Sequence, residues 1–288
     1  MCVKTKRKHV GTKAQIIAMK EREKRIATTV FLAFILIIAA VSGYYTYTFL
    51  NQPRNPASPF KAAIVDHLSL TFPNQTFRET ATNILKQAGY MVDYYPGEKV
   101  TVDFYRNLPA CGYKIVILRV HCGIDPSRQS IAFFTSEVFR QSRYVDELLT
   151  DHLEWTAYDY PPPAGEPLYF GINSLFVKDS MKGRFSETTI IMMGCYGLEY
   201  PSMAKAFIQK GAKAYISWKG SVTADHTDKA TINLLKHLIL EKQAVGQAVE
   251  NTMREVGEDP AYKSTLTYYL PEAGEQTAQD IMRNHKTG

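Results

Sequence analysis

The chain has 288 residues with a formal net charge of +6, and 45% of them are hydrophobic, which suits one large α/β domain or two small ones. The positive charge is concentrated at the amino end, where residues 1–26 hold nine of the 34 Lys and Arg residues but only two of the 28 acidic ones. The remainder carries a net charge of −1. This argues against nucleic acid as a partner, because neutralising phosphates needs a concentrated basic face.

Residues 27–50 carry no charge over 24 positions, which is long enough for a helix that crosses a bilayer. Three tyrosines near the far end match the aromatic belt of a membrane interface, and the positive-inside rule keeps the basic residues 1–26 in the cytoplasm. We therefore expect a single-pass anchor in the cell membrane, with the main domain outside. The alternative is a cleaved secretory signal with a small-residue site at 40–42, although the apolar run is longer than a usual signal core.

Residues 51–60 contain three prolines and predict a stiff, polar linker. Residues 61–66 then predict a first strand, a helix follows that ends at Gly89, and residues 91–95 predict a second strand. This β-α-β start, with its right-handed crossover, predicts a parallel sheet.

The rest of the chain continues the alternation of strands and helices. Residues 131–134 predict a short edge strand. Residues 138–187 predict an irregular insertion that shapes a cleft, with residues 169–177 as a candidate for a strand and turn. The other expected strands are 114–120, 190–193, 213–218 and 265–270. We therefore expect an α/β domain over residues 61–270, with a mostly parallel sheet flanked by helices, and a flexible tail over residues 271–288.

Two of these expected strands end in residues suited to nucleophilic catalysis. His121 follows the strand at 114–120, and Cys195 follows the strand at 190–193. If the strands are neighbours, both side chains emerge at the carboxyl edge of the sheet, where open α/β sheets bind ligands. An imidazole within hydrogen-bond reach turns a thiol into a nucleophile and later protonates the leaving amine. The alternatives are a small cysteine in a tight turn and a histidine satisfied at a strand end.

These motifs resemble those of the caspase-like, or caspase-haemoglobinase, cysteine peptidases, which include the gingipains, separase and the CHAT domains. In that superfamily an apolar strand ends in His-Gly, and a later apolar strand ends in a small residue followed by Cys. KIVILRVHCG and TTIIMMGCYG occur here in that order, and the resemblance covers about residues 61–256.

The resemblance implies a caspase-like three-layer sandwich with His121 as the general base and Cys195 as the nucleophile. It also implies that the N–H of Cys195, next to Gly194, lies in the oxyanion hole. The superfamily's second oxyanion donor is the glycine directly after the histidine, whereas this chain has Cys122 there and Gly123 one position later.

A second polar cluster, formed by Asp225, His226 and Asp228, follows the strand at 213–218. The resemblance places it near the strand edge that helps to line the substrate pocket, where its acidity would suit a basic side chain. Alternatively, Asp225 or Thr227 only caps the helix that follows. The cluster lacks a recognised metal-ligand spacing, so we expect no metal and no cofactor. Three other histidines have no partner in the sequence pattern, and we expect them to be structural or solvated. They are His67, His152 and His237.

The sequence thus predicts a membrane-anchored cysteine peptidase that acts on peptide or protein substrates. The alternative, from a different class, is a catalytically silent module of the same fold that binds peptides or partner proteins at the outer membrane face. A nucleotide-binding α/β domain is disfavoured, since no glycine-rich phosphate loop follows the first strand.

Overall fold

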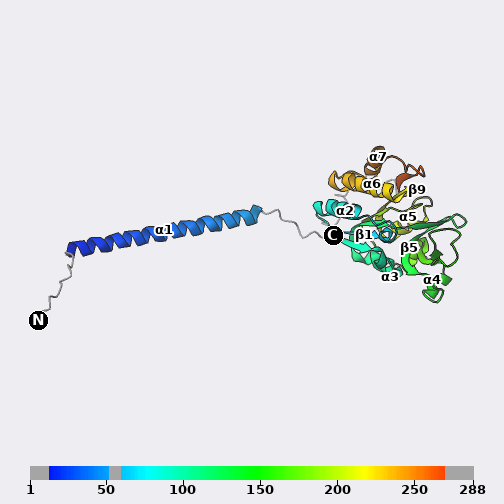
Figure 1. The fold of residues 1–288 in the computed structure, drawn as a ribbon, viewed down its shortest axis with the longest axis horizontal. Coiled ribbons are helices and arrows are strands. Elements are labelled where there is room, and N and C mark those ends of the chain that lie inside the picture. The colour runs from blue at the N-terminus through cyan, green and yellow to red at the C-terminus, as the bar shows by residue number, and fades with distance from the viewer. Residues whose placement is uncertain (1–12, 52–59, 270–288) are drawn as a thin grey trace, which may run out of the picture. The chain divides into compact units, whose positions relative to one another are not determined.

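The structure is a computed structural model that describes residues 13–51 and 60–269 (Figure 1). These residues belong to two separate units, the long helix α1 (Lys13–Asn51) and an α/β domain. Most of the linker predicted at 51–60, and the tail predicted at 271–288, lie outside the described residues.

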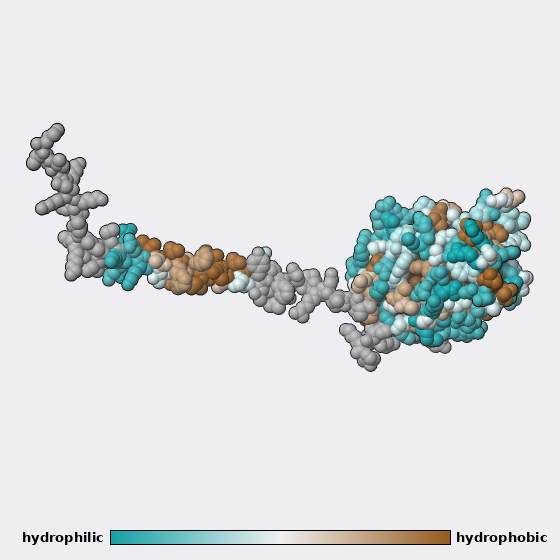
Figure 2. All heavy atoms as spheres, turned by 90° about the horizontal axis from the view of Figure 1, so that it is seen from below, coloured by the Kyte–Doolittle hydropathy of each residue, from teal (hydrophilic) through white to brown (hydrophobic). Residues whose placement is uncertain are grey.

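Helix α1 contains a segment, Lys20–Tyr44, that is long and apolar enough to cross a membrane, with a mean hydropathy of 2.5. Figure 2 shows the apolar band along this helix. The helix begins well before residue 27, where the apolar run starts. The reason is that the basic segment before the run is rich in Lys, Arg, Glu and Ala, which are strong helix formers.

Six strands form the main sheet, sheet A, in the order β10-β9-β8-β3-β1-β2. Their bounds are β1 (Lys61–Asp66), β2 (Met91–Pro96), β3 (Tyr113–Arg119), β8 (Thr188–Met192), β9 (Ala212–Lys219) and β10 (Thr265–Tyr269). All neighbouring pairs are parallel except β10 with β9. The predicted α/β domain with a mostly parallel sheet is therefore confirmed. Every residue of β3 and β8 is buried, which explains their continuous apolar runs.

Two hydrophobic cores cover the two faces of sheet A, because side chains alternate along each strand. Side chains of α2 (Gln75–Gln87), α6 (Ala224–Leu235) and α7 (Val245–Val256) form one core with the sheet. Figure 1 shows these three helices grouped on one side of the domain. The other core includes α3 (Val102–Asn107), α5 (Ser202–Gln209) and a second sheet. The remaining helical segments are His67–Leu70, Gly97–Lys99, Leu108–Cys111, α4 (Val145–Leu149), Phe176–Ser180 and Lys236–Leu240.

The second sheet, sheet B, contains four antiparallel strands in the order β4-β5-β7-β6. Their bounds are β4 (Cys122–Asp125), β5 (Ser130–Val138), β6 (Leu153–Thr156) and β7 (Tyr169–Ile172). The prediction of a short edge strand at 131–134 is wrong, because β5 is longer and lies between β4 and β7. Its middle residues are all buried, so the alternating pattern of a half-exposed strand is absent. The predicted irregular insertion likewise supplies two strands of this sheet.

Candidate active site

His121 and Cys195 leave sheet A from adjacent points. Strands β3 and β8 are neighbouring parallel strands, which is the condition under which the sequence places both residues at one edge, and the Met193 N–H extends their pairing by donating to Leu118 O at 2.8 Å. Gly194 then lies so close to the Val120 carbonyl that a Cβ atom would collide with it. Cys195 follows Gly194 and His121 follows Val120. Glycine at position 194 therefore permits the close approach of the two backbones just before these two residues.

Cys195 lies on a sharp turn that the neighbouring β9–α6 loop holds in place. Tyr196 has a φ of 59°, in the left-handed region that non-glycine residues seldom adopt. Its N–H donates to Gly220 O at 2.7 Å, and the Leu198 N–H donates to Trp218 O at 3.0 Å. Such a backbone persists only where its surroundings enforce it, and this kind of strain is concentrated at functional sites.

The sulfur of Cys195 is held by the backbone of Val222, just before helix α6. The Val222 N–H donates to Sγ at 3.4 Å, and the thiol donates to Val222 O at 3.6 Å. Helix α5, the next helix along the chain after Cys195, begins only at Ser202. Val222, which binds the sulfur, lies two residues before the start of α6. Burial raises the pKa of the Cys195 thiol, although hydrogen bonds from Val222 and Ser221 oppose the shift. The thiol is therefore protonated at neutral pH.

His121 is held in an aromatic environment, with Nε2 placed 2.8 Å from Thr71 Oγ1. The rings that contact it are those of His67, Phe72, Phe134 and Tyr158. Burial, assisted by His67 and the positive charge of Arg119, lowers the pKa of His121 to about 4. The imidazole is therefore neutral at neutral pH, which leaves it able to accept a proton.

His67 is a second buried histidine at this edge, which the sequence analysis set aside as structural or solvated. It follows β1 and is 0% exposed, with its ring centroid 5.9 Å from that of His121 in an edge-on contact. Neither ring nitrogen makes a hydrogen bond within the described residues. Burial lowers the pKa of His67 to about 4, and the backbone of Thr135 and the charge of Asp66 oppose this only in part. The sequence contained a signal for His67, namely its position directly after β1. His121 has a similar position, two residues after the end of the neighbouring strand β3.

The two histidines make the stability of the domain sensitive to acid. A histidine with a folded-state pKa near 4 and an unfolded value near 6.5 binds its proton first in the unfolded chain, so the unfolding free energy falls as the pH drops through that window. Each is expected to contribute a loss of roughly 3 kcal/mol between pH 7 and pH 4. Chemical denaturation of the full chain across this range should show a clearly shallower pH dependence in His67→Leu. An unchanged dependence would contradict the assignment.

Arg119 ends β3 with its guanidinium buried between two carboxylates. Nη1 donates to Asp66 Oδ1 at 2.7 Å, while Nε and Nη2 donate to the two oxygens of Asp228 at 2.7 and 2.8 Å. Nη2 also donates to Phe72 O at 2.8 Å. The exposed fraction is 1% for Arg119 and Asp66 and 4% for Asp228. This network joins β1, β3 and α6 and holds the Phe72 backbone at the edge of the site.

The residues of the predicted polar cluster have separate environments on α6. Asp228 is buried and paired with Arg119, whereas Asp225 is exposed in the first turn of the helix. His226 Nε2 lies 3.1 Å from Gly257 O, at the end of α7. Thr227 does not cap the helix: its hydroxyl donates to Met193 O and accepts from Trp218 Nε1. No group of three or more His, Cys, Asp or Glu side chains is arranged to hold a metal within the described residues.

The two glycines expected near the oxyanion hole also have defined places. The Gly194 N–H donates to the sulfur of Met192 at 3.1 Å, so it does not point at the thiol. Gly123 pairs with Ala132 in the ladder between β4 and β5. Cys122 packs against the core around sheet B and contributes to the pockets beside Cys195, and burial raises the pKa of its thiol well above the usual range.

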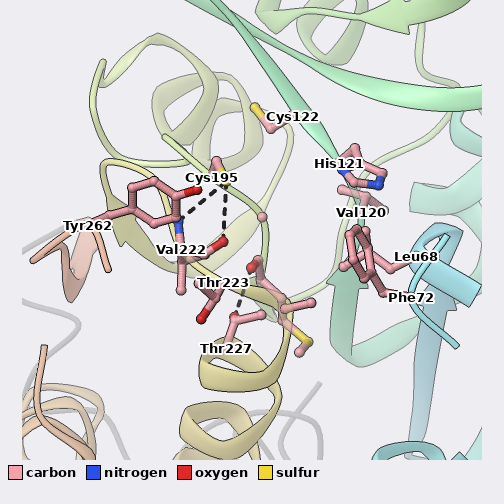
Figure 3. A pocket seen from close by; sticks show the side chains of 13 residues that line it. Leu68, Phe72, Val120, His121, Cys122, Cys195, Val222, Thr223, Thr227 and Tyr262 are labelled. Carbon is pink, nitrogen blue, oxygen red and sulfur yellow. Dashed lines mark hydrogen bonds between the residues drawn. The ribbon is translucent and has the colours of Figure 1, made fainter. Parts of the chain in front are cut away.

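Two pockets share four lining residues, which are Phe72, His121, Cys122 and Cys195. The thiol pocket, of about 280 Å³, lies between the ends of β3 and β8, the start of α6 and Tyr262. The tyrosine pocket, of about 430 Å³, lies toward Tyr158 and sheet B. Figure 3 shows Cys195 and Tyr262 on one side of the thiol pocket, with His121 and Phe72 on the other. The predicted base and nucleophile thus line the same two pockets.

Compared with known protein families and with curated proteins, the chain matches none. A functional assignment therefore depends on the chemistry of this site, since an α/β fold by itself supports many unrelated functions.

Proposed function

We propose that this protein is a membrane-anchored, caspase-like cysteine peptidase with Cys195 as nucleophile and His121 as general base. The observation that carries the proposal is the convergence of these two side chains on shared pockets at the carboxyl ends of β3 and β8. The order of the HCG and GCYG motifs on neighbouring parallel strands supports the resemblance. In this proposal α1 spans the membrane, residues 1–26 stay in the cytoplasm, and the domain meets peptide or protein substrates outside.

His121 can act as the base through the nitrogen that faces away from Thr71. In the neutral tautomer with the proton on Nε2, that N–H donates to Thr71 Oγ1 and leaves the Nδ1 lone pair to accept a proton. No hydrogen bond to Nδ1 occurs within the described residues. Thr71 would thus orient the base, as the third group of a catalytic triad does.

The chemistry begins when Cys195 Sγ attacks the scissile carbonyl carbon while its proton passes to His121. The tetrahedral intermediate collapses to a thioester as the protonated His121 gives its proton to the leaving amine. Water then attacks the thioester, with His121 taking the water's proton, and the carboxylic acid product leaves as the proton returns to Sγ. Because both groups are neutral before substrate binds, the proton transfer accompanies the attack rather than preceding it.

Cleavage of a peptide library by the full chain in detergent tests the proposal. His121→Ala is expected to lower kcat/KM for the best peptide by roughly 10²-fold or more, because general acid–base catalysis contributes about that much. His152→Ala is the matched control, since His152 is a half-buried histidine that contacts Ser180 and lines neither pocket. Equal rates for the wild type and His121→Ala would contradict the proposal.

The second candidate is a silent module of the same fold that binds peptides. The observation in its favour is Cys122, which stands where the superfamily has its second oxyanion donor. A silent module would bind library peptides without cleaving them, and Cys195→Ala would leave their dissociation constants unchanged.

A further inference from the structure

We infer that the thiol pocket receives the side chain of the substrate residue whose carbonyl Cys195 attacks, and that this side chain is uncharged and apolar. This inference rests on the proposed peptidase function and names its substrate class. It differs from the expectation that the acidic cluster on α6 receives a basic side chain.

The thiol pocket is joined directly to the residue that holds the sulfur. The Val222 side chain lines the pocket, while the Val222 backbone bonds to Cys195 Sγ from both its N–H and its carbonyl. Figure 3 shows these two bonds beside the pocket. A side chain that fills the pocket therefore lies next to the attacking atom. That arrangement suits the residue at the scissile carbonyl better than one farther along the peptide.

The walls of the thiol pocket are largely apolar. Leu68, Phe72 and Ala224 contribute to them together with Val222, and Tyr262 lies at the mouth with 58% of its surface exposed. The described residues that line the pocket include no Asp, Glu, Lys or Arg. His121 is the remaining basic group, and its lowered pKa, caused mainly by burial, leaves it neutral.

Asp259, which bonds to the lining residues Thr223 and Tyr262, accepts two hydrogen bonds on each carboxylate oxygen. It is 0% exposed, and Oδ2 accepts from both the N–H and the hydroxyl of Thr223, at 2.9 and 2.8 Å. Its Oδ1 accepts from the N–H groups of Ala261 and Tyr262, each at 2.9 Å. A lysine or arginine side chain in the pocket could pair with Asp259 only by displacing one of these four hydrogen bonds.

The buried charges of Asp228 and Arg119, behind this edge of the sheet, are paired with each other. Asp228 has both oxygens bonded to Arg119, and the guanidinium in turn donates four hydrogen bonds, to Asp66, Asp228 and the Phe72 carbonyl. Asp225 follows Ala224 but is exposed at the start of α6 and does not line the pocket. Among the described residues that line the pocket, neither a basic nor an acidic substrate side chain would find a charged partner. Burying an unpaired charge is strongly unfavourable, whereas burying a leucine, methionine or phenylalanine side chain is favourable.

The test uses the full chain and a panel of peptides that differ only at the residue before the scissile bond. Leu, Met and Phe peptides are expected to have kcat/KM values at least about tenfold above those of the Arg, Lys, Asp and Asn peptides. Cleavage of an Arg, Lys or Asp peptide at an equal or higher rate would overturn the inference and leave the proposed peptidase intact.

Binding separates the inference from the proposed function. If the wild type cleaves none of the peptides, the proposed function fails, and the same panel is then titrated against the Cys195→Ala protein by calorimetry. Dissociation constants at least about tenfold lower for the apolar peptides support the selectivity of the pocket. Equal dissociation constants for all the peptides, or no detectable binding, would overturn the inference.

Tyr262→Asp provides a variant with a directional readout. A carboxylate at the exposed mouth of the pocket should shift the ratio of kcat/KM for Arg over Leu peptides by at least about tenfold in favour of Arg. The ratio is used because a new negative charge near Cys195 also lowers the absolute rate. Leu149→Asp is the control, since Leu149 is 80% exposed on α4 and lines neither pocket. An unchanged ratio in Tyr262→Asp, or an equal shift in Leu149→Asp, would overturn the placement of the side chain in this pocket.

Discussion

Replacing Cys195 by alanine is expected to lower kcat/KM for peptide cleavage by roughly 10³-fold or more, because no other group replaces the sulfur as nucleophile. The sulfur is only partly buried and is held by the weak hydrogen bonds of Val222, so its loss should leave the fold intact. Cleavage should be measured for the full chain with the best library peptide, and the melting temperatures of both proteins should be compared.

Cys111→Ala is the matched control for this variant. Cys111 is also a free thiol, but it is exposed and belongs to the segment Leu108–Cys111, before β3 rather than after it. Its replacement should leave kcat/KM within about twofold, as for other surface substitutions. A Cys195→Ala protein that cleaves as fast as the wild type would contradict the proposed mechanism.

Replacing Arg119 by methionine is expected to lower the unfolding free energy by about 3–5 kcal/mol, because it leaves Asp66 and Asp228 buried without their partner. Methionine fills much of the same space, so the loss reports mainly the uncompensated charges. Urea denaturation of the full chain, followed by a signal from the α/β domain, measures the change.

Two further variants make the interpretation specific. Arg128→Met removes an arginine that is 58% exposed and pairs loosely with Asp125 and Asp151 at 3.6 Å, so it should cost less than about 1 kcal/mol. Neutralising both carboxylates in the Arg119→Met background, with Asp66→Asn and Asp228→Asn, should recover part of the loss. A destabilisation no larger in Arg119→Met than in Arg128→Met would show that the buried network contributes little.

Much of sheet A could be predicted from the sequence because its strands are central and buried. The runs at 115–118 and 190–193 are apolar without a break, which is typical of parallel strands covered on both faces. The β-α-β start predicted a parallel sheet, so that His121 and Cys195 would emerge at one edge if their strands were neighbours. Sheet B could not be predicted in the same way, because β4, β6 and β7 have only four residues each and lie within or beside irregular segments.

The partners of the site residues were harder to predict from the sequence. An arginine inside the run KIVILRV signals that a buried counter-charge must exist, and Asp66 ends the neighbouring strand directly opposite Arg119. The choice of Asp228 rather than Asp225 as the second partner depends on which face of α6 packs toward sheet A. Because the two residues are three positions apart on one helix, their spacing alone does not distinguish them. For His67 a signal existed in its place just after β1, but its contact with His121 also requires β1 and β3 to be neighbours in the sheet.

The most direct test of the central claim is covalent capture of Cys195 by substrate-like electrophiles. The full chain is incubated with three peptidyl acyloxymethyl ketones that carry Leu, Arg or Asp next to the ketone. The thiol displaces the carboxylate to form a thioether, and mass spectrometry maps the adducts. The account predicts that at least one probe alkylates Cys195 at least about tenfold faster than the exposed Cys111, and that His121→Ala removes this preference. If all three probes label the two cysteines equally, or label Cys195 as fast without His121, the His121–Cys195 pair is not a catalytic dyad.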